Sequence, residues 1–73
     1  MQEIDYEQEP DSRMLREAEV SKILNVSQWT LQDWRRNHTG PPYAKLGKAV
    51  RYPLGALRLW ITNQTVDPKA AMN

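Results

Sequence analysis

The sequence contains no cysteine and only one histidine, His38. The lack of cysteine excludes disulfide bonds, thiolate nucleophiles and zinc sites built on cysteine. One histidine cannot form a metal site alone. The sequence also shows no glycine-rich phosphate loop and no recognisable pairing of a nucleophile with a base. We therefore expect a protein that is not an enzyme and that needs no metal or cofactor.

Long apolar stretches are also missing. No run approaches the roughly 20 residues that a membrane-spanning helix needs. The first twelve residues are acidic, whereas a secretory signal peptide begins with a basic region followed by an apolar one. We expect a cytoplasmic protein without membrane contact, and its 73 residues suffice for one domain with a small core.

The net charge of +1 hides a strong separation of charge along the chain. Residues 1–12 contain five acidic side chains and no basic one, whereas residues 13–62 contain nine basic side chains against three acidic ones. A basic folded region behind an acidic leader is typical of nucleic-acid binding, although it also fits a well-solubilised domain.

Two helices joined by a tight turn are predicted in the first half of the basic region. Val20, Ile23 and Leu24 give residues 16–24 an apolar helical face. Asn25 follows, and asparagine tolerates the left-handed conformation of a tight turn. Ser27 is a good N-cap for a second helix that runs to about Asn37 and ends before the Gly-Pro-Pro at 40–42.

A hairpin and a third helix are predicted to follow. Residues 43–46 and 49–52 have the composition of two short strands, with Gly47 and Lys48 forming the turn between them. The third helix starts near residues 53–55 and carries Leu57, Trp60 and Ile61 on one face. The fold class is mainly α with a small β-hairpin.

The second helix has two distinct faces at 3.6 residues per turn. Leu31 and Trp34 define its buried side, and we expect Trp34 and Trp60 in the core. The opposite side forms a strip of four residues with spacing i, i+3, i+4 and i+7. This strip consists of Trp29, Gln32, Asp33 and Arg36.

The strip has the chemistry of base and phosphate recognition. The amide of Gln32 can bind adenine bidentately, and the guanidinium of Arg36 can bind guanine or phosphate. The carboxylate of Asp33 can accept a hydrogen bond from cytosine. Two structural alternatives stay open. Trp29 could fold down over the acidic leader or the third helix, and Asp33 and Arg36 could form an ordinary ion pair on a solvated face.

The hairpin brings three cations, Lys45, Lys48 and Arg51, into one short segment. Each phosphate that they neutralise would add roughly 0.9 to the salt dependence of binding. The alternative is a solvated hairpin whose lysines prevent pairing of the strand edges. Lys48, at the tip, is the strongest candidate for a contact.

The segment from Asn25 to Ile61 resembles the winged-helix excisionase and AlpA-type regulator family, a relative of the MerR DNA-binding domain found in phages and mobile elements. The resemblance is carried by VSQWTLQDWRR, by GPPYAKLGKAVRY and by Leu57 and Trp60 of the closing helix. It implies a winged helix-turn-helix whose second helix enters the major groove of double-stranded DNA. The family often has arginine at the positions of Gln32 and Asp33, so the resemblance implies DNA binding but does not give the base preference of this chain.

The predicted DNA contacts come from the second helix and from the wing, as the hairpin is called in this fold. They are Ser27, Gln28, Trp29, Thr30, Gln32, Asp33, Arg35 and Arg36 in the helix and Lys45, Lys48 and Arg51 in the wing. We expect residues 1–12 to be a disordered acidic leader, residues 13–63 the DNA-binding domain, and residues 64–73 a flexible tail.

The resemblance implies an excisionase, which binds and bends DNA beside an integrase and promotes excision of a phage or mobile element. Integrase and further copies on DNA are then possible partners. A transcriptional regulator of the AlpA or MerR kind would use the same surface, and a protein-interaction module would use the exposed Trp29. These alternatives stay open at the level of sequence.

Overall fold

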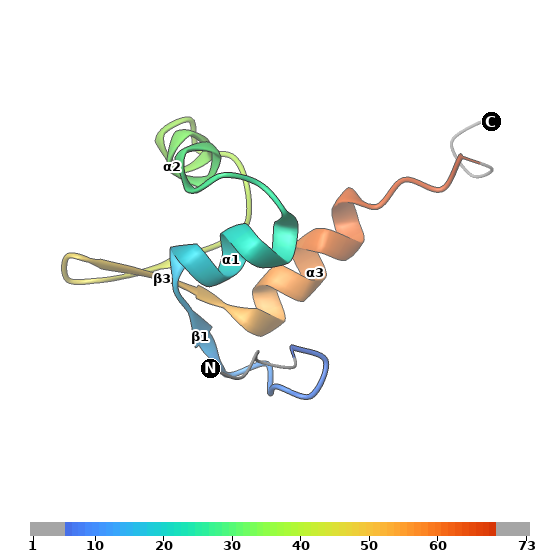
Figure 1. The fold of residues 1–73 in the computed structure, drawn as a ribbon, viewed down its shortest axis with the longest axis horizontal. Coiled ribbons are helices and arrows are strands. Elements are labelled where there is room, and N and C mark those ends of the chain that lie inside the picture. Colours follow the sequence, from blue (N-terminus) through green and yellow to red (C-terminus); the bar gives the residue numbers. More distant parts are fainter. Residues whose placement is uncertain (1–5, 69–73) are drawn as a thin grey trace.

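The computed structural model describes residues 6–68, and it confirms a winged helix-turn-helix (Figure 1). The elements are β1 (Met14–Leu15), α1 (Glu17–Leu24), α2 (Gln28–Arg36), β2 (Ala44–Leu46), β3 (Ala49–Pro53) and α3 (Leu54–Gln64). In Figure 1, α1 lies at the centre, α2 above it, and the β2–β3 hairpin projects away from the body. The fold thus places α2 and the hairpin at one side of the molecule.

The turn between α1 and α2 has the predicted conformation. Asn25 adopts the left-handed conformation with φ 56°, and the amide of Val26 donates to the carbonyl of Ser21 at 3.1 Å. Two residues later, the hydroxyl of Ser27 accepts a hydrogen bond from the amide of Thr30 at 3.0 Å and caps α2. These local bonds satisfy backbone groups that the ends of both helices leave free.

The core is small and draws on almost every element. Six residues are at most 2% exposed: Leu15, Val20, Leu31, Tyr52, Leu54 and Leu57. Trp34 and Trp60 pack against this cluster but stay partly exposed, with ring centroids 5.8 Å apart. Both tryptophans therefore join the core at its edge, and Leu31 is the single fully buried residue of α2.

The sheet has three strands, whereas the sequence predicted only the two of the hairpin. β1 pairs with β3 through Leu15 and Tyr52, giving the order β1-β3-β2. A strand of two residues is too short for the alternation that identifies strands in sequence. In the hairpin, Gly47 has φ 65° and occupies the first central position, which is the arrangement of a type II′ turn.

Residues 6–12, which belong to the predicted acidic leader, lie against α3. The guanidinium of Arg58 donates to the carboxylate of Asp11 at 2.6 Å, to the carbonyl of Glu9 at 2.9 Å and to the carbonyl of Tyr6. The amide of Gly55 donates to the carbonyl of Asp11 at 3.0 Å. The free amides of a helix start attract chain oxygens, a contact that composition alone does not reveal.

Two parts of the predicted boundaries lie outside the described residues, namely 1–5 of the leader and 69–73 of the tail. Helix α3 ends at Gln64, and residues 65–68 are exposed. The flexibility of the tail stays a prediction.

The connector after α2 turns back over Trp34 at Gly40. The amide of Thr39 donates to the carbonyl of Trp34 at 2.8 Å, and Gly40 follows with φ 86°. A Cβ atom at Gly40 would lie 2.9 Å from the Cβ of Trp34. Only glycine fits this position without strain, because both the positive φ and the close approach disfavour a side chain.

We predict that Gly40→Ala lowers the free energy of unfolding by about 2 kcal/mol or more, because left-handed strain and the clash with Trp34 act together. Gly47→Ala is the matched control. It has a positive φ but no atom within 4 Å of the added Cβ, so we expect a loss of about 1 kcal/mol. Urea unfolding followed by tryptophan fluorescence measures both, and equal losses would show that the contact with Trp34 is unimportant.

Candidate nucleic-acid interface

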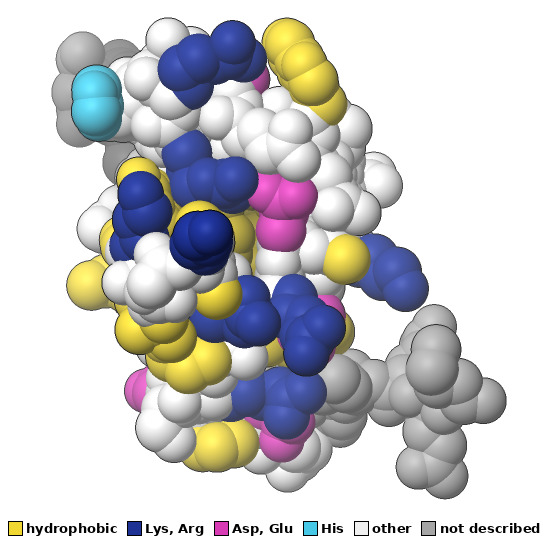
Figure 2. Space-filling view, turned by 90° about the vertical axis from the view of Figure 1, so that its left-hand side faces the viewer, with side chains coloured by type: hydrophobic (Ala, Val, Ile, Leu, Met, Phe, Trp, Pro, Cys, Tyr) yellow, Lys and Arg dark blue, Asp and Glu magenta, His cyan; other side chains and the backbone are white. Residues whose placement is uncertain are grey.

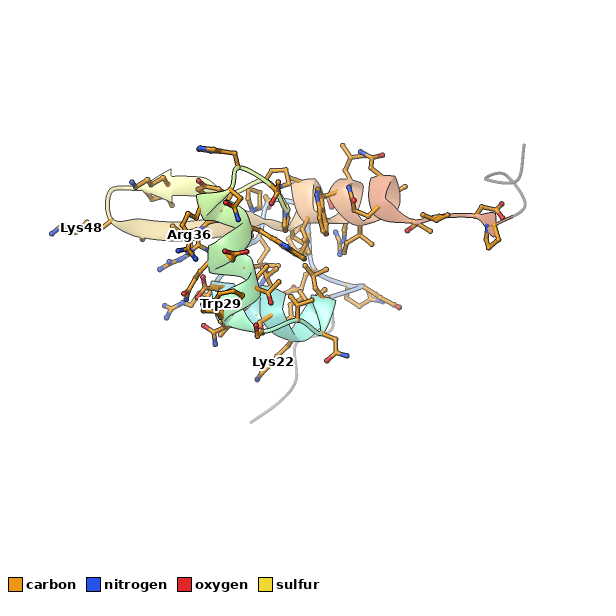
Figure 3. All side chains as sticks on the ribbon, turned by 90° about the horizontal axis from the view of Figure 1, so that it is seen from above. Lys22, Trp29, Arg36 and Lys48 are labelled. Carbon is orange, nitrogen blue, oxygen red and sulfur yellow. The ribbon has the colours of Figure 1, made fainter. Side chains whose placement is uncertain are left out.

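The strip of α2, called the α2 strip below, lies on the side of the molecule from which the hairpin projects and consists of Trp29, Gln32, Asp33 and Arg36. Figure 3 shows Trp29 and Arg36 on this side of α2 and Lys48 at the tip of the hairpin, whereas Lys22 extends from α1 in a different direction. Trp29 is 65% exposed, so the alternative in which it folds down as part of the core is wrong. Helix and hairpin thus form one surface, with the ring of Trp29 open to solvent.

Basic side chains dominate this surface. Figure 2 shows lysine and arginine side chains gathered over it from top to bottom, with few acidic groups between them. The arrangement provides the attraction that a phosphate backbone requires.

The cations on the hairpin are not neutralised within the described part of the chain. Lys45 and Lys48 are exposed, Arg51 is half-buried, and none of the three forms an ion pair with residues 6–68. The guanidinium of Arg51 donates to the carbonyl of Val50 at 2.9 Å, which fixes its direction without changing its charge. The hairpin therefore carries the free positive charge of this surface.

Arginines on α2 are paired instead. Arg36 contacts the carboxylate of Asp33 at 3.1 Å, the pairing that the sequence left open as an alternative. The side chain of Arg36 is still 67% exposed, so most of its guanidinium can bind another group. An exposed pair of this kind contributes little to stability and separates readily.

Arg35 of α2 is hydrogen-bonded to both α1 and β3. Its Nη1 donates to Glu17 Oε1 of α1 at 2.7 Å and to the hydroxyl of Tyr52 of β3 at 2.7 Å, and its Cζ lies 5.8 Å from the ring centroid of Tyr43. Partial burial lowers the pKa of Arg35, but the hydrogen bonds to Glu17 and Tyr52 raise the pKa by more than burial lowers it. The pKa of Arg35 therefore lies above its ordinary value. Arg35 is therefore a charged link between α1, α2 and β3.

The remaining predicted contacts lie at the start of α2. The Ser27 hydroxyl shares a hydrogen bond of 2.9 Å with that of Thr30, so both are engaged in capping, while the side chain of Gln28 is exposed. Whether these residues, Arg35 or the hairpin cations touch DNA stays a prediction.

Glu17 and Tyr52 are functional neighbours that the sequence analysis missed. Glu17 accepts hydrogen bonds from Gln32 and from Arg35, and the hydroxyl of the buried Tyr52 accepts one from Arg35. A contact over 15 or more residues depends on how the helices cross, so no local spacing indicates it. The sequence indicates this contact only through the presence of an acidic residue, Glu17, in the first helix and an arginine, Arg35, in the second.

Residues 6–68 contain no group of three or more histidine, aspartate or glutamate side chains placed to hold a metal ion. No helix in the same range has the length and apolar character to cross a membrane.

A protein-family model described as a helix-turn-helix domain matches residues 14–65, which is more than half of the chain and spans β1 to the end of α3. No curated protein and no solved structure matches the chain.

We predict that Tyr52→Phe lowers the free energy of unfolding by about 1.5 kcal/mol, because it removes a hydrogen bond to a charged group. Tyr43→Phe is the matched control, since no hydrogen bond of the Tyr43 hydroxyl is seen within residues 6–68, and we expect a change within about 0.5 kcal/mol. Urea unfolding measures both. A loss in Tyr52→Phe no larger than in the control would mean that the hydroxyl does not support Arg35.

Proposed function

The chain belongs to the helix-turn-helix domain family, and from this membership and the surface described above we propose how it binds double-stranded DNA. Helix α2 enters the major groove, and the β2–β3 hairpin contacts the backbone or minor groove beside it. The observation that carries the proposal is the position of Lys48, which forms no ion pair within residues 6–68, on the same side of the molecule as the exposed α2 strip.

The two parts of the surface have different tasks in this proposal. The hairpin, with Lys45, Lys48 and Arg51, supplies attraction to phosphate that does not depend on sequence. The α2 strip contains an aromatic ring, an amide, a carboxylate and a guanidinium, which are suited to discriminating base edges. Since Asp33 partly neutralises Arg36, α2 contributes less to general affinity than to choice of site.

The role we propose for this binding is that of an excisionase, which bends DNA next to an integrase and promotes excision. Its support is the resemblance of residues 25–61 to that family and a surface with α2 and the hairpin at the same side of the molecule, which can hold a groove and its flank together. A transcriptional regulator would use the same surface, so the two roles must be separated by assay.

We predict that Lys48→Ala weakens duplex binding and makes the negative slope of log K against log salt less steep by about 0.9, because one phosphate contact is lost. Arg36→Ala should also weaken binding. Lys22→Ala, which makes the same change of charge at a side chain that extends from α1 in a different direction, should leave affinity nearly unchanged. Fluorescence anisotropy with a labelled duplex at several salt concentrations measures all three.

The proposed binding surface is contradicted if Lys48→Ala and Arg36→Ala bind the duplex as tightly as the parent protein at moderate salt. It is also contradicted if Lys22→Ala weakens binding as much as they do. Circular dichroism and urea unfolding of each variant exclude loss of fold as the cause.

We predict that the protein stimulates integrase-dependent excision on a substrate with the element's own attachment sites, and that Lys48→Ala stimulates it less. The assay compares the yield of excised circle with and without the protein, using integrase from the same element. Specific duplex binding without any effect on excision would reject the excisionase role and favour the regulator.

A further inference from the structure

Gln32 is held in one orientation by a residue of the preceding helix. Its Nε2 donates a hydrogen bond to Glu17 Oε2 at 3.0 Å, although the side chain of Gln32 is exposed at the surface of α2. An exposed glutamine is otherwise free to rotate its amide and to exchange the positions of its oxygen and nitrogen. The contact with Glu17 removes this freedom.

The chemistry of Glu17 decides which end of the amide it binds. An ionised carboxylate only accepts hydrogen bonds, so it selects the Nε2 end of Gln32. One N–H of Nε2 is then used, and the second N–H and Oε1 remain for another partner. A donor beside an acceptor is the pattern that matches N7 and N6 of adenine in the major groove.

Glu17 is itself anchored to the core. Its other oxygen, Oε1, accepts from Arg35, whose Nη1 also donates to the hydroxyl of Tyr52. Tyr52 is 0% exposed, and the side chain of Glu17 only 20%. The positive charge of Arg35 also offsets the carboxylate, which reduces the repulsion between Glu17 and a nearby phosphate.

We propose that Glu17 is a positioning residue for base recognition, which presents the amide of Gln32 to an adenine in the major groove. The inference rests on the proposed binding of DNA through α2 and adds which base Gln32 reads and why. Glu17 does not touch the base. It acts by fixing the direction of an amide that does.

The experiment begins with a duplex site selected by the parent protein from a random pool. Binding is then measured for all four base pairs at each position of that site. The proteins compared are the parent, Gln32→Ala, Glu17→Gln and the double variant. Glu19→Gln is the matched control, because it makes the same change of charge in the first turn of α1 without contact to Gln32.

We expect Gln32→Ala to lose the preference for adenine at one position, a loss of about 5- to 150-fold in discrimination. Glu17→Gln should lose preference at the same position, because its amide presents a donor where Gln32 or Arg35 needs an acceptor. The double variant should lose no more than Gln32→Ala. Glu19→Gln should change affinity equally for all four bases.

Glu17→Asp provides a second variant in case Glu17→Gln is unstable. It keeps the charge but is one methylene shorter, so it cannot reach both Gln32 and Arg35, and we expect the same loss at the same position. The side-chain amide signals of Gln32 in the NMR spectrum of the free protein give an independent measurement. They should change in Glu17→Gln and stay unchanged in Glu19→Gln.

The inference is overturned if Glu17→Gln and Glu17→Asp keep the adenine preference of the parent, or if the Gln32 amide signals do not respond to Glu17. A uniform loss of affinity for all bases would assign Glu17 a purely structural role and also overturn it. Failure of the parent protein to select any duplex would instead overturn the proposed function on which the inference rests.

Discussion

Arg35 lies where α1, α2 and the sheet meet, and its guanidinium is bonded to a residue from each neighbour. Helix α2 contributes only Leu31 to the fully buried core, so apolar packing alone restrains its rotation weakly. A partly buried ion pair adds little net stability, since desolvation offsets much of its attraction. The ion pair instead sets the orientation of α2, because Glu17 and Tyr52 together fix which side of the helix faces outward.

The distribution of charge follows from the same arrangement. Three acidic residues form ion pairs with arginines of the folded body: Glu17 with Arg35, Asp33 with Arg36 and Asp11 with Arg58. The hairpin has no such partner within residues 6–68, so its positive charge is available to an external anion. Residues 9 and 11 of the leader are bound at Arg13 and α3 and do not cover the hairpin.

Features set by neighbouring residues were predictable from sequence. Asn25 in the turn, Ser27 as N-cap, Gly47 in the hairpin and the exposed side of α2 all depend on local conformation or on helical period. The pairing of β1 with β3, the docking of residues 6–12 and the contacts of Glu17 join segments far apart in the chain. Such contacts depend on how elements cross in space, and two-residue strands or single charges give no periodic signal.

The pairing of Leu15 with Tyr52 joins the start of the matched domain to the strand that precedes α3, and this has a consequence for the order of folding. The turn between α1 and α2 and the hairpin use near neighbours and can form early, whereas β1 and β3 must meet by closing a long loop. Leu15 pairs with the same Tyr52 whose hydroxyl binds Arg35. The final orientation of α2 is therefore reached only when this loop closes, and a partly folded chain with both helices formed would still lack the complete surface.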